Sequence, residues 1–217
     1  MKSNKNNQLA LTERVKPTQA RAVETREKIL AAAAQLLEDS GVEGLTTKKA
    51  AELAGVRIRS VYRYFPNKLA IVHALAQQAT LPEEALFDVY RDLENPDIDW
   101  KPALRELIDA VYMIGAEIPG LKAIRAAMQA SPELRAVDAA MNERHAEALC
   151  QALLKRRANI SSQKAMAAAR TVVETSTCML DLAWFESQRP EGAENAALLL
   201  EELKTMASAY LAVYLPS

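Results

Sequence analysis

The sequence predicts an all-α protein. Half of its 217 residues are hydrophobic, alanine and leucine are abundant, and only 6 residues are glycine. Alanine and leucine favour helices, whereas runs of Val, Ile and Thr, which favour strands, are few. No segment shows the alternation of apolar and polar residues that is expected of a half-buried strand. The length is sufficient for one domain of ordinary size or two small ones.

Four helices are expected in the first third of the chain, each with a start or stop signal. Their approximate ranges are 25–41, 46–55, 57–64 and 67–81. Apolar residues recur at spacings of three and four in the first, and Gly41 stops it. Thr46 or Thr47 can cap the second. The third stops before Pro66, because the residue before a proline avoids helical angles. Asn67 can cap the fourth.

The rest of the chain predicts longer helices separated by proline and glycine. Their approximate ranges are 81–95, 99–118, 121–130, 131–157, 161–188 and 194–215. Asp99 and Ser161 are suitable N-caps, because their side-chain oxygens can accept from backbone N–H groups of the first turn. Ser131 followed by Pro132 is a strong start signal, since proline is favoured in the first turn.

Charge is distributed unevenly along the chain. The first 68 residues contain 13 Lys and Arg and 7 Asp and Glu, a net charge of +6. The remaining residues contain 14 and 21, a net charge of −7. We therefore expect the basic first part, and not the acidic second part, to meet an anionic partner. Residues 1–20 are polar, Asn-rich and basic, which is typical of a flexible arm.

The stretch "TTKKAAELAGVRIRSVYRYFPNK" combines two short helices, a turn with glycine and several cations. Two helices joined in this way predict a helix-turn-helix, whose second helix enters the major groove of DNA. The apolar residues expected to fix the angle between the helices are Ala50, Ala51, Leu53, Val56, Val61 and Phe65.

The polar residues of this stretch are candidates for contacts to double-stranded DNA. They are Thr46, Thr47, Lys48, Arg57, Arg59, Ser60, Tyr62, Arg63, Tyr64 and Lys68. Arg59 and Arg63 lie four residues apart and share a helix face, and arginine can donate two hydrogen bonds to guanine. The hydroxyl groups and Lys68 suit phosphate contacts, which fix register and not base preference. By itself, a basic helix rich in tyrosine is more often a solvated face.

The stretch "TREKILAAAAQLLEDSGVEGLTTKKAAELAGVRIRSVYRYFPNKLAIVHAL" resembles the N-terminal domain of the TetR family of bacterial transcriptional regulators. The resemblance covers about 50 residues. It implies a three-helix DNA-binding domain at 21–68, after the arm at 1–20, and a larger helical domain at 69–217 that dimerises and usually binds a small-molecule inducer. The family commonly has serine where this sequence has Arg57, and often glycine at Arg59. A weaker helix cap is therefore expected, and the resemblance does not define the operator sequence.

The second domain contains candidates for an inducer site. They are Tyr112, Met113, Glu117, Met128, Met141, Thr177, Cys178, Asp181 and Trp184. Methionine adapts to irregular cavities, and a buried polar group needs a partner. Apolar residues at helical spacing nevertheless belong to a core far more often than to a pocket.

The two C-terminal helices are apolar over most of their circumference. In residues 161–188 the stripe consists of Ala165, Ala169, Val172, Val173, Ser176, Leu180, Ala183 and Trp184. In residues 194–215, Leu199, Leu203, Met206, Tyr210 and Val213 form one stripe, and Leu198, Leu200, Ala207, Leu211 and Tyr214 extend it. Such helices need burial on more than one side, which predicts a homodimer through residues 161–215.

Other functions have little support in the sequence. His73 and His145 lack metal-ligand spacing, Cys150 and Cys178 lack a nearby Cys or His, and no catalytic motif is present, so we expect no metal, cofactor or enzymatic activity. No secretory signal or span of about 20 apolar residues is found, which predicts a cytoplasmic protein without a membrane partner. The expected function is an operator-binding repressor released by an inducer. The alternative is a helical protein that binds a small molecule or partner without operator specificity.

Overall fold

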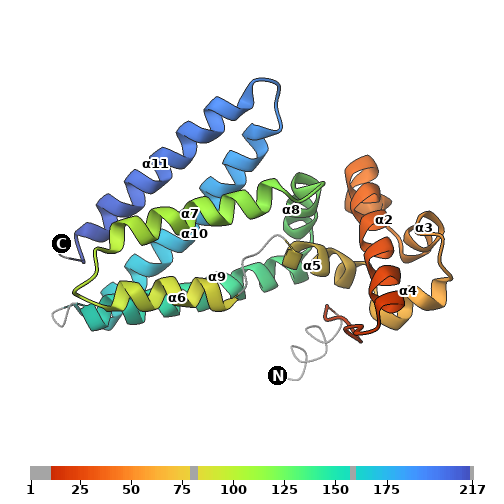
Figure 1. Ribbon diagram of the computed structural model, residues 1–217, viewed down its shortest axis with the longest axis horizontal. Helices are drawn as coiled ribbons and strands as arrows, with labels where there is room; N and C mark the ends of the chain where they lie inside the picture. Colours follow the sequence, from red (N-terminus) through yellow and green to blue (C-terminus); the bar gives the residue numbers. More distant parts are fainter. Residues whose placement is uncertain (1–10, 79–82, 157–159, 216–217) are drawn as a thin grey trace. The chain divides into compact units, whose positions relative to one another are not determined.

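The computed structural model describes residues 11–78, 83–156 and 160–215, and the regular structure of these residues is entirely helical (Figure 1). The all-α prediction is therefore confirmed. The first four helices are α2 (Ala20–Gly44), α3 (Thr47–Leu53), α4 (Ile58–Tyr64) and α5 (Lys68–Gln78). The others are α6 (Glu83–Glu94), α7 (Trp100–Ala116), α8 (Leu121–Ala130), α9 (Pro132–Arg156), α10 (Ser162–Ser187) and α11 (Gly192–Ala212).

Side-chain caps form where the sequence predicts them. The Thr46 side chain accepts a hydrogen bond from the Lys49 N–H (3.1 Å), and the Asn67 Oδ1 accepts from the Ala70 N–H (2.9 Å). Asp99 and Ser161 accept in the same way at the starts of α7 and α10. Each side chain satisfies one of the N–H groups that a helix start leaves without a partner.

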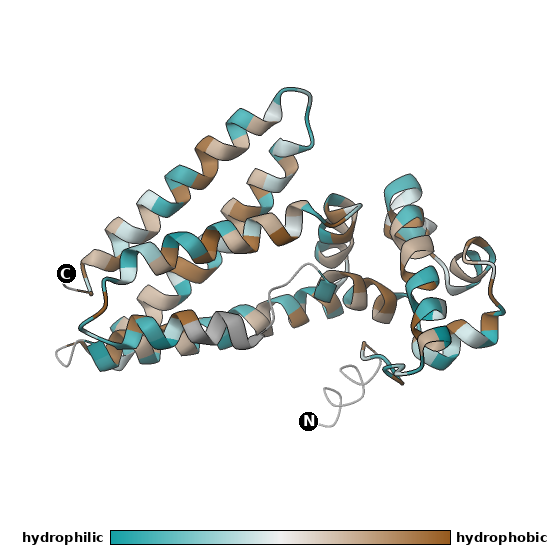
Figure 2. Cartoon of the chain, in the orientation of Figure 1, coloured by the Kyte–Doolittle hydropathy of each residue, from teal (hydrophilic) through white to brown (hydrophobic). Residues whose placement is uncertain are grey.

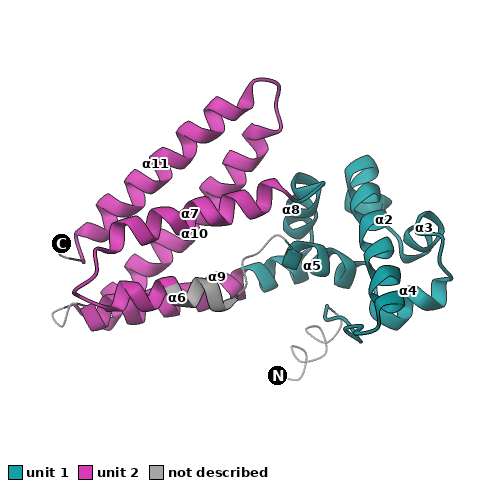
Figure 3. Cartoon of the chain, viewed as in Figure 1, with its two compact units in different colours: residues 1–79, 118–138 teal, residues 80–117, 139–217 magenta. Residues whose placement is uncertain are grey.

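The chain divides into two compact units, one comprising residues 1–79 and 118–138 and the other comprising residues 80–117 and 139–217 (Figure 3). The first unit extends beyond the expected DNA-binding segment 21–68. The reason is tertiary, because α8 packs against both α2 and α5. The division therefore assigns α5 and α8 to the first unit.

Unit 1 has a continuous apolar core in which α2 packs against α3, α4, α5 and α8. Its fully buried side chains include Ile29, Leu37, Leu45, Phe65, Ile71 and Ile124. The helical angles of α2 are broken at Gly41, whose φ is 65°. This break lies at the position where the sequence predicts the first helix to stop.

The segment before α2 is packed in its described part. Leu11 is buried in the core of unit 1, and the Arg14 N–H donates to the carbonyl oxygen of Tyr64 at 2.8 Å. The expectation of a flexible arm up to residue 20 is therefore wrong for residues 11–14. Residues 1–10 lie outside the described residues. Sequence composition missed the packing because Leu11 is the one buried apolar side chain among residues 11–19.

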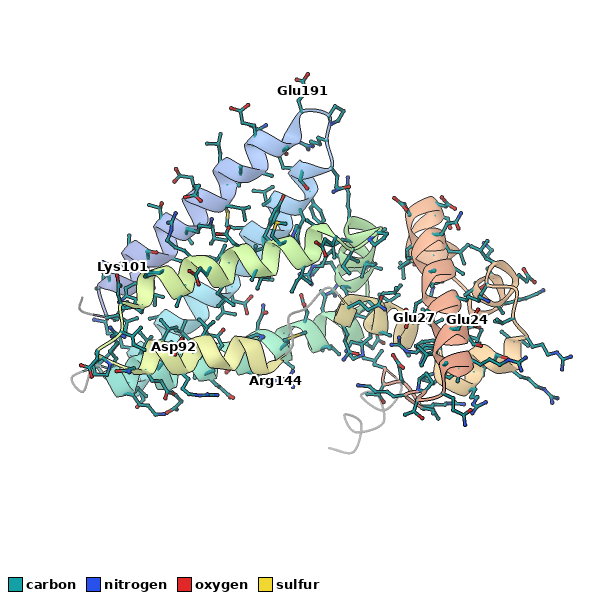
Figure 4. The ribbon with its side chains drawn as sticks, in the orientation of Figure 1. Glu24, Glu27, Asp92, Lys101, Arg144 and Glu191 are labelled. Atoms are coloured by element: carbon teal, nitrogen blue, oxygen red, sulfur yellow. The ribbon has the colours of Figure 1, made fainter. Side chains whose placement is uncertain are left out.

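Unit 2 contains the hairpin of α10 and α11, on which α7 packs (Figure 1). The turn between these two helices contains Glu191, which is labelled in Figure 4 and adopts a φ of 60°. Apolar and polar residues alternate along α7 and α11 (Figure 2), as expected of helices that bury one face.

A close contact in unit 2 depends on the absence of a side chain at Gly115. A Cβ at this position would lie 2.3 Å from Cζ2 of Trp184, which is too short for two carbon atoms. The indole of Trp184 stacks on the Tyr112 ring at 6.4 Å between centroids, and its Nε1 donates to the Tyr112 carbonyl oxygen at 2.9 Å. These contacts join α7 to α10.

Candidate nucleic-acid interface

The helices α3 and α4 are joined by a tight turn. Gly55 has a φ of 65°, which L-amino acids with a side chain rarely adopt, and its N–H donates to the Glu52 carbonyl oxygen at 3.2 Å. The Val56 N–H then donates to the Ala51 carbonyl oxygen at 3.0 Å. This geometry is a helix-turn-helix, as the sequence predicts.

The predicted core of the helix-turn-helix is confirmed except at one residue. Ala50, Ala51, Val61 and Phe65 are buried and Val56 is partly buried, but Leu53 is 48% exposed. The cause is helical geometry. The inward face of α3 is centred between Ala50 and Ala51. Successive residues of a helix are rotated by about 100°, so Leu53 points roughly 110° away from the centre of that face.

The outward face of α4 carries arginines. Arg57, Arg59 and Arg63 are exposed. Within the described ranges neither Arg57 nor Arg59 has a hydrogen-bond or ion-pair partner on its side chain, and Arg63 lies 5.9 Å from the centroid of the Tyr64 ring. An unpaired guanidinium keeps five N–H donors available for an external anion or base edge. The face is therefore suited to a polyanionic ligand.

Arg57 occupies the N-cap position of α4 and forms no side-chain cap. The weaker cap expected from the sequence is confirmed. The Ser60 N–H still finds the Arg57 carbonyl oxygen at 2.8 Å. The start of α4 is thus stabilised by backbone contacts and turn geometry only, and the Arg57 side chain remains available for a ligand.

Hydroxyl groups flank the arginines of α4. The Tyr62 side chain is exposed, and its Oη lies 3.1 Å from Oγ1 of Thr47. Thr46 is exposed at the start of α3, and Lys48 is exposed there with its Nζ 3.9 Å from a carboxylate oxygen of Glu52. These four predicted residues are placed where they can contact a phosphate backbone together with α4.

Two predicted DNA contacts are engaged within the protein. Tyr64 is only 3% exposed and belongs to the core of unit 1, so the prediction of a surface hydroxyl at this position is wrong. It lies three residues after Val61 and shares its inward face. The Lys68 Nζ donates to the Val42 carbonyl oxygen at 2.8 Å, although its two other N–H groups remain for a second acceptor.

Ile58 is a candidate that the sequence interpretation omitted. It is the first residue of α4 and is exposed in spite of its apolar side chain. Recognition helices use their N-terminal residues for base contacts, and an apolar side chain can contact the methyl group of thymine. The sequence signal for this role is the position of Ile58 between Arg57 and Arg59.

The predicted inducer residues do not form one cluster. Met128 lies on α8 in the core of unit 1, and Met113, Glu117 and Cys178 are exposed, so these four do not line an enclosed site within unit 2. The sequence pattern shows on which side of its helix a residue lies. It does not show which other segment packs against that side, so burial could not be predicted. The remaining candidates are Tyr112, Met141, Thr177, Asp181 and Trp184, which are buried or half-buried in unit 2.

A polar contact joins α9 to α10 near these residues. The Thr177 Oγ1 donates to Oδ1 of Asn142 at 3.4 Å, and the Nδ2 of Asn142 donates to Glu174 at 3.1 Å.

The buried Tyr90 ring lies 6.1 Å from the His145 ring, and burial raises the pKa of Tyr90 to about 12. Asn142 and Tyr90 had no distinctive sequence signal.

The apolar stripes of the two C-terminal helices have different environments. The stripe of α10 is mostly buried within the chain, and so are Leu203 and Leu211 of α11. Exposed apolar side chains remain at Leu182 on α10, at Leu198 and Met206 on α11, and at Val213, the C-cap of α11. A partner surface on this hairpin would therefore use these exposed residues and not the buried leucines.

Within the described ranges, no helix combines the length and apolarity needed to cross a bilayer. In the same ranges, no group of three or more His, Cys, Asp or Glu side chains is arranged to hold a metal ion.

A helix-turn-helix with an arginine-rich second helix, joined to an all-helical unit, defines a class of helical DNA-binding regulators. Residues 29–75 match the family described as bacterial regulatory proteins, tetR family. Residues 99–211, more than half of the chain, match the tetracyclin repressor-like C-terminal domain. The chain therefore belongs to the TetR family.

Curated relatives agree with this membership. The chain is 38% identical over 82 residues to tetracycline repressor protein class C of Escherichia coli, covering 37% of this chain and 34% of that protein. It is 31% identical over 135 residues to the nucleoid occlusion factor SlmA of Alteromonas mediterranea, covering 61% and 68%. The chain spans only about a third of the length of the tetracycline repressors that it matches.

Solved structures share the fold. NalD of Pseudomonas aeruginosa, described as the secondary repressor of the MexAB-OprM multidrug efflux pump, has a TM-score of 0.66 and 21% identity, covering 87% of this chain and 98% of that chain. GusR of Salmonella enterica has a TM-score of 0.60 and 19% identity, covering 91% and 99%.

Proposed function

We propose that this chain is a DNA-binding transcriptional regulator whose α4 enters the major groove of an operator. The proposal rests on two exposed arginines, Arg57 at the N-cap of α4 and Arg59 in its first turn, which have no partner in the described chain. Fully available guanidinium groups suit bidentate recognition of guanine and of phosphate. The tetR match over residues 29–75 and the repressors among the relatives support the same function.

The residues of the interface divide into two roles. Arg59 and Arg63 share the outward face of α4 and contact base edges, together with Ile58 at its start. The proposed phosphate contacts surround them, at Thr46, Thr47, Lys48, Arg57, Ser60, Tyr62 and Lys68. Base contacts determine which operator is bound, whereas phosphate contacts set the affinity for any DNA and its dependence on salt.

We further propose that two copies of the chain associate through α10 and α11. Leu182, Leu198, Met206 and Val213 are exposed on these helices, and a self-complementary partner surface would remove them from water. A twofold dimer then presents two α4 helices to half-sites about 34–36 Å apart, or a multiple of that distance.

A small-molecule inducer would act through unit 2 and make the protein a cytoplasmic, ligand-released repressor. The proposed contacts are Tyr112, Met141, Thr177, Asp181 and Trp184, which lie on α7, α9 and α10. The dimer can adopt a geometry that fits the operator or one that does not. A ligand at this place releases DNA only if its affinity for the second geometry is higher than its affinity for the first. Contacts that hold unit 2 equally well in both geometries would not change DNA affinity.

The direct test measures binding to DNA fragments from upstream of the gene that encodes the chain. We expect one fragment to bind at least roughly a thousandfold more tightly than a scrambled sequence of the same length, with log Kd rising linearly with log salt. Equal affinity for all fragments, or none, would favour the alternative of a helical small-molecule-binding protein without operator specificity.

A further inference from the structure

The C-terminal end of α4 is held by a segment from far earlier in the chain. The backbone N–H of Arg14 donates to the carbonyl oxygen of Tyr64 at 2.8 Å, and Nη1 of the same arginine donates to the carbonyl oxygen of Tyr62 at 3.1 Å. One residue thus satisfies two of the last carbonyl groups of the helix. Its positive charge also lies at the helix C-terminus, where the helix dipole favours a cation.

Helix α4 depends on such outside contacts because it is short. It has seven residues, whereas isolated helices below roughly 12 residues are marginal in water. Its N-cap residue, Arg57, forms no side-chain cap. At its other end the Phe65 N–H donates to the Val61 carbonyl oxygen at 2.8 Å, and Arg14 donates to the Tyr62 and Tyr64 carbonyl oxygens.

Arg14 is itself fixed by its neighbours in the segment. The Glu13 side chain is only 5% exposed and accepts two hydrogen bonds from the Arg26 guanidinium of α2, the one from Nε at 3.0 Å. Hydrogen bonding to Glu13 raises the pKa of Arg26. Leu11 is buried in the core, and its carbonyl oxygen lies 3.0 Å from Nδ1 of His73 on α5. The segment is therefore anchored to α2 and α5 while it contacts α4.

We propose that residues 11–14 form a strap that fixes the orientation of α4, with Glu13 and Arg14 as positioning residues for operator binding. Base-edge hydrogen bonds require side chains placed within a fraction of an ångström, so a loosened α4 loses affinity although its own side chains are intact. The effect on DNA rests on the function proposed above, whereas the ordering of α4 does not.

A competing explanation is that Arg14 merely adds positive charge near the phosphates. The two explanations predict opposite changes in DNA affinity when Glu13 is replaced. Electrostatics predicts that Glu13→Gln, which removes a negative charge, leaves DNA binding unchanged or tighter. A strap predicts weaker binding, because the buried pair with Arg26 is broken. Lys16 supplies the matched control, since it is an exposed cation without a side-chain partner in the described chain.

The experiment compares the full-length wild type with Arg14→Met, Glu13→Gln and Lys16→Met. Hydrogen exchange of the amides of residues 61–65 reports the order of α4, and the amides of residues 29–37 in α2 serve as the internal standard for folding of unit 1. Operator affinity is measured over a series of salt concentrations. We expect Arg14→Met and Glu13→Gln to speed exchange in α4 and weaken binding, each roughly tenfold, with unchanged protection in α2.

Lys16→Met should leave exchange unchanged, and its effect on binding should be limited to a small loss of affinity for all DNA sequences and a shallower salt dependence. Unchanged α4 exchange in both strap variants, or a Glu13→Gln variant that binds as tightly as wild type, overturns the strap. If the wild type binds no DNA selectively, the proposed function fails, and the exchange data alone still decide whether residues 11–14 order α4. A strap variant that also loses protection in α2 is replaced by Leu11→Val, a milder change in the same segment. This variant must then speed hydrogen exchange in α4 without changing exchange in α2.

Discussion

The arginines of α4 and the cations of unit 2 differ in what they contact. Arg57 and Arg59 are exposed and lack an ion-pair partner in the described chain. Cations of unit 2 lie beside carboxylates, in the pairs Arg105–Glu201, Lys155–Glu94, Arg170–Glu143, Arg189–Glu186 and Lys204–Asp109. The charges of these five cations are thus compensated within unit 2, whereas the charges of Arg57 and Arg59 are left for an external partner.

Lys204 shows how a buried cation of unit 2 is compensated. Burial lowers the pKa of this lysine, but hydrogen bonds to Asp109 and Glu201 outweigh burial, and the pKa is raised. A buried cation is tolerated because two carboxylates face it. The comparison teaches that the number of arginines does not identify the interface, because unit 2 also has many. Arg57 and Arg59 stand out because they lack partners and also lie at the start of the second helix of the helix-turn-helix.

The largest expected effect concerns the two sides of α11. Leu203 is 1% exposed and Leu198 is 60% exposed on the same helix. We expect Leu203→Arg to lower the free energy of unfolding by roughly 4 kcal/mol or more, because it places an unpaired charge in the core. We expect Leu198→Arg to stay folded but become monomeric. Thermal denaturation and light scattering measure the two outcomes, and a dimeric Leu198→Arg variant would argue against the proposed partner surface.

The next effect tests the partnerless arginines directly. Arg59→Ala should weaken operator binding by roughly 1–3 kcal/mol and relax the preference at one base pair, with no loss of stability. The matched control is Arg170→Ala, which removes an arginine paired with Glu143 and should leave DNA binding unchanged. Binding to a set of single-base operator variants provides the measurement. Uniform weakening on every sequence would instead identify Arg59 as a phosphate contact.

A smaller effect is the dependence of protein stability on pH that Tyr90 of unit 2 causes. Burial raises the pKa of Tyr90 in unit 2 to about 12. Between pH 10 and 12 the unfolded chain releases this proton while the folded chain keeps it, so stability must fall as pH rises. The loss is about 1 kcal/mol at pH 11. Urea unfolding at pH 8 and pH 11 measures it, and Tyr90→Phe should lack this part of the decline. Equal declines in both proteins would show that Tyr90 titrates normally.

The smallest effects separate the two tyrosines of α4. Tyr62→Phe removes an exposed hydroxyl beside Thr47, and should weaken binding to all DNA sequences by roughly 0.5–1.5 kcal/mol without altering base preference. Tyr64→Phe removes the hydroxyl group of a buried tyrosine and should leave DNA affinity unchanged when protein stability is unchanged. Fluorescence anisotropy on operator and scrambled DNA checks both. A larger loss from Tyr64→Phe would require that α4 moves when it binds DNA.

Local sequence signals determined the helices and the place of the interface. Thr46, Asn67, Asp99 and Ser161 form the predicted caps, because capping depends on residues within a few positions of one another. The outward face shared by Arg59 and Arg63 follows from helical periodicity in the same way. The resemblance to the TetR family follows from an ordered set of such local signals in the first 75 residues, and the match over residues 99–211 establishes the membership.

Only the tertiary structure decided which side chains are free. Tyr64 and Met128 are buried by helices distant in sequence, and Leu203 is buried by the chain itself and not by a second copy. Arg14 contacts Tyr62 across 48 residues of sequence, so neither composition nor periodicity could assign it. The physical reason is that a sequence pattern fixes the direction of a side chain on its own helix, whereas burial and hydrogen bonding depend on which distant segment packs against that face.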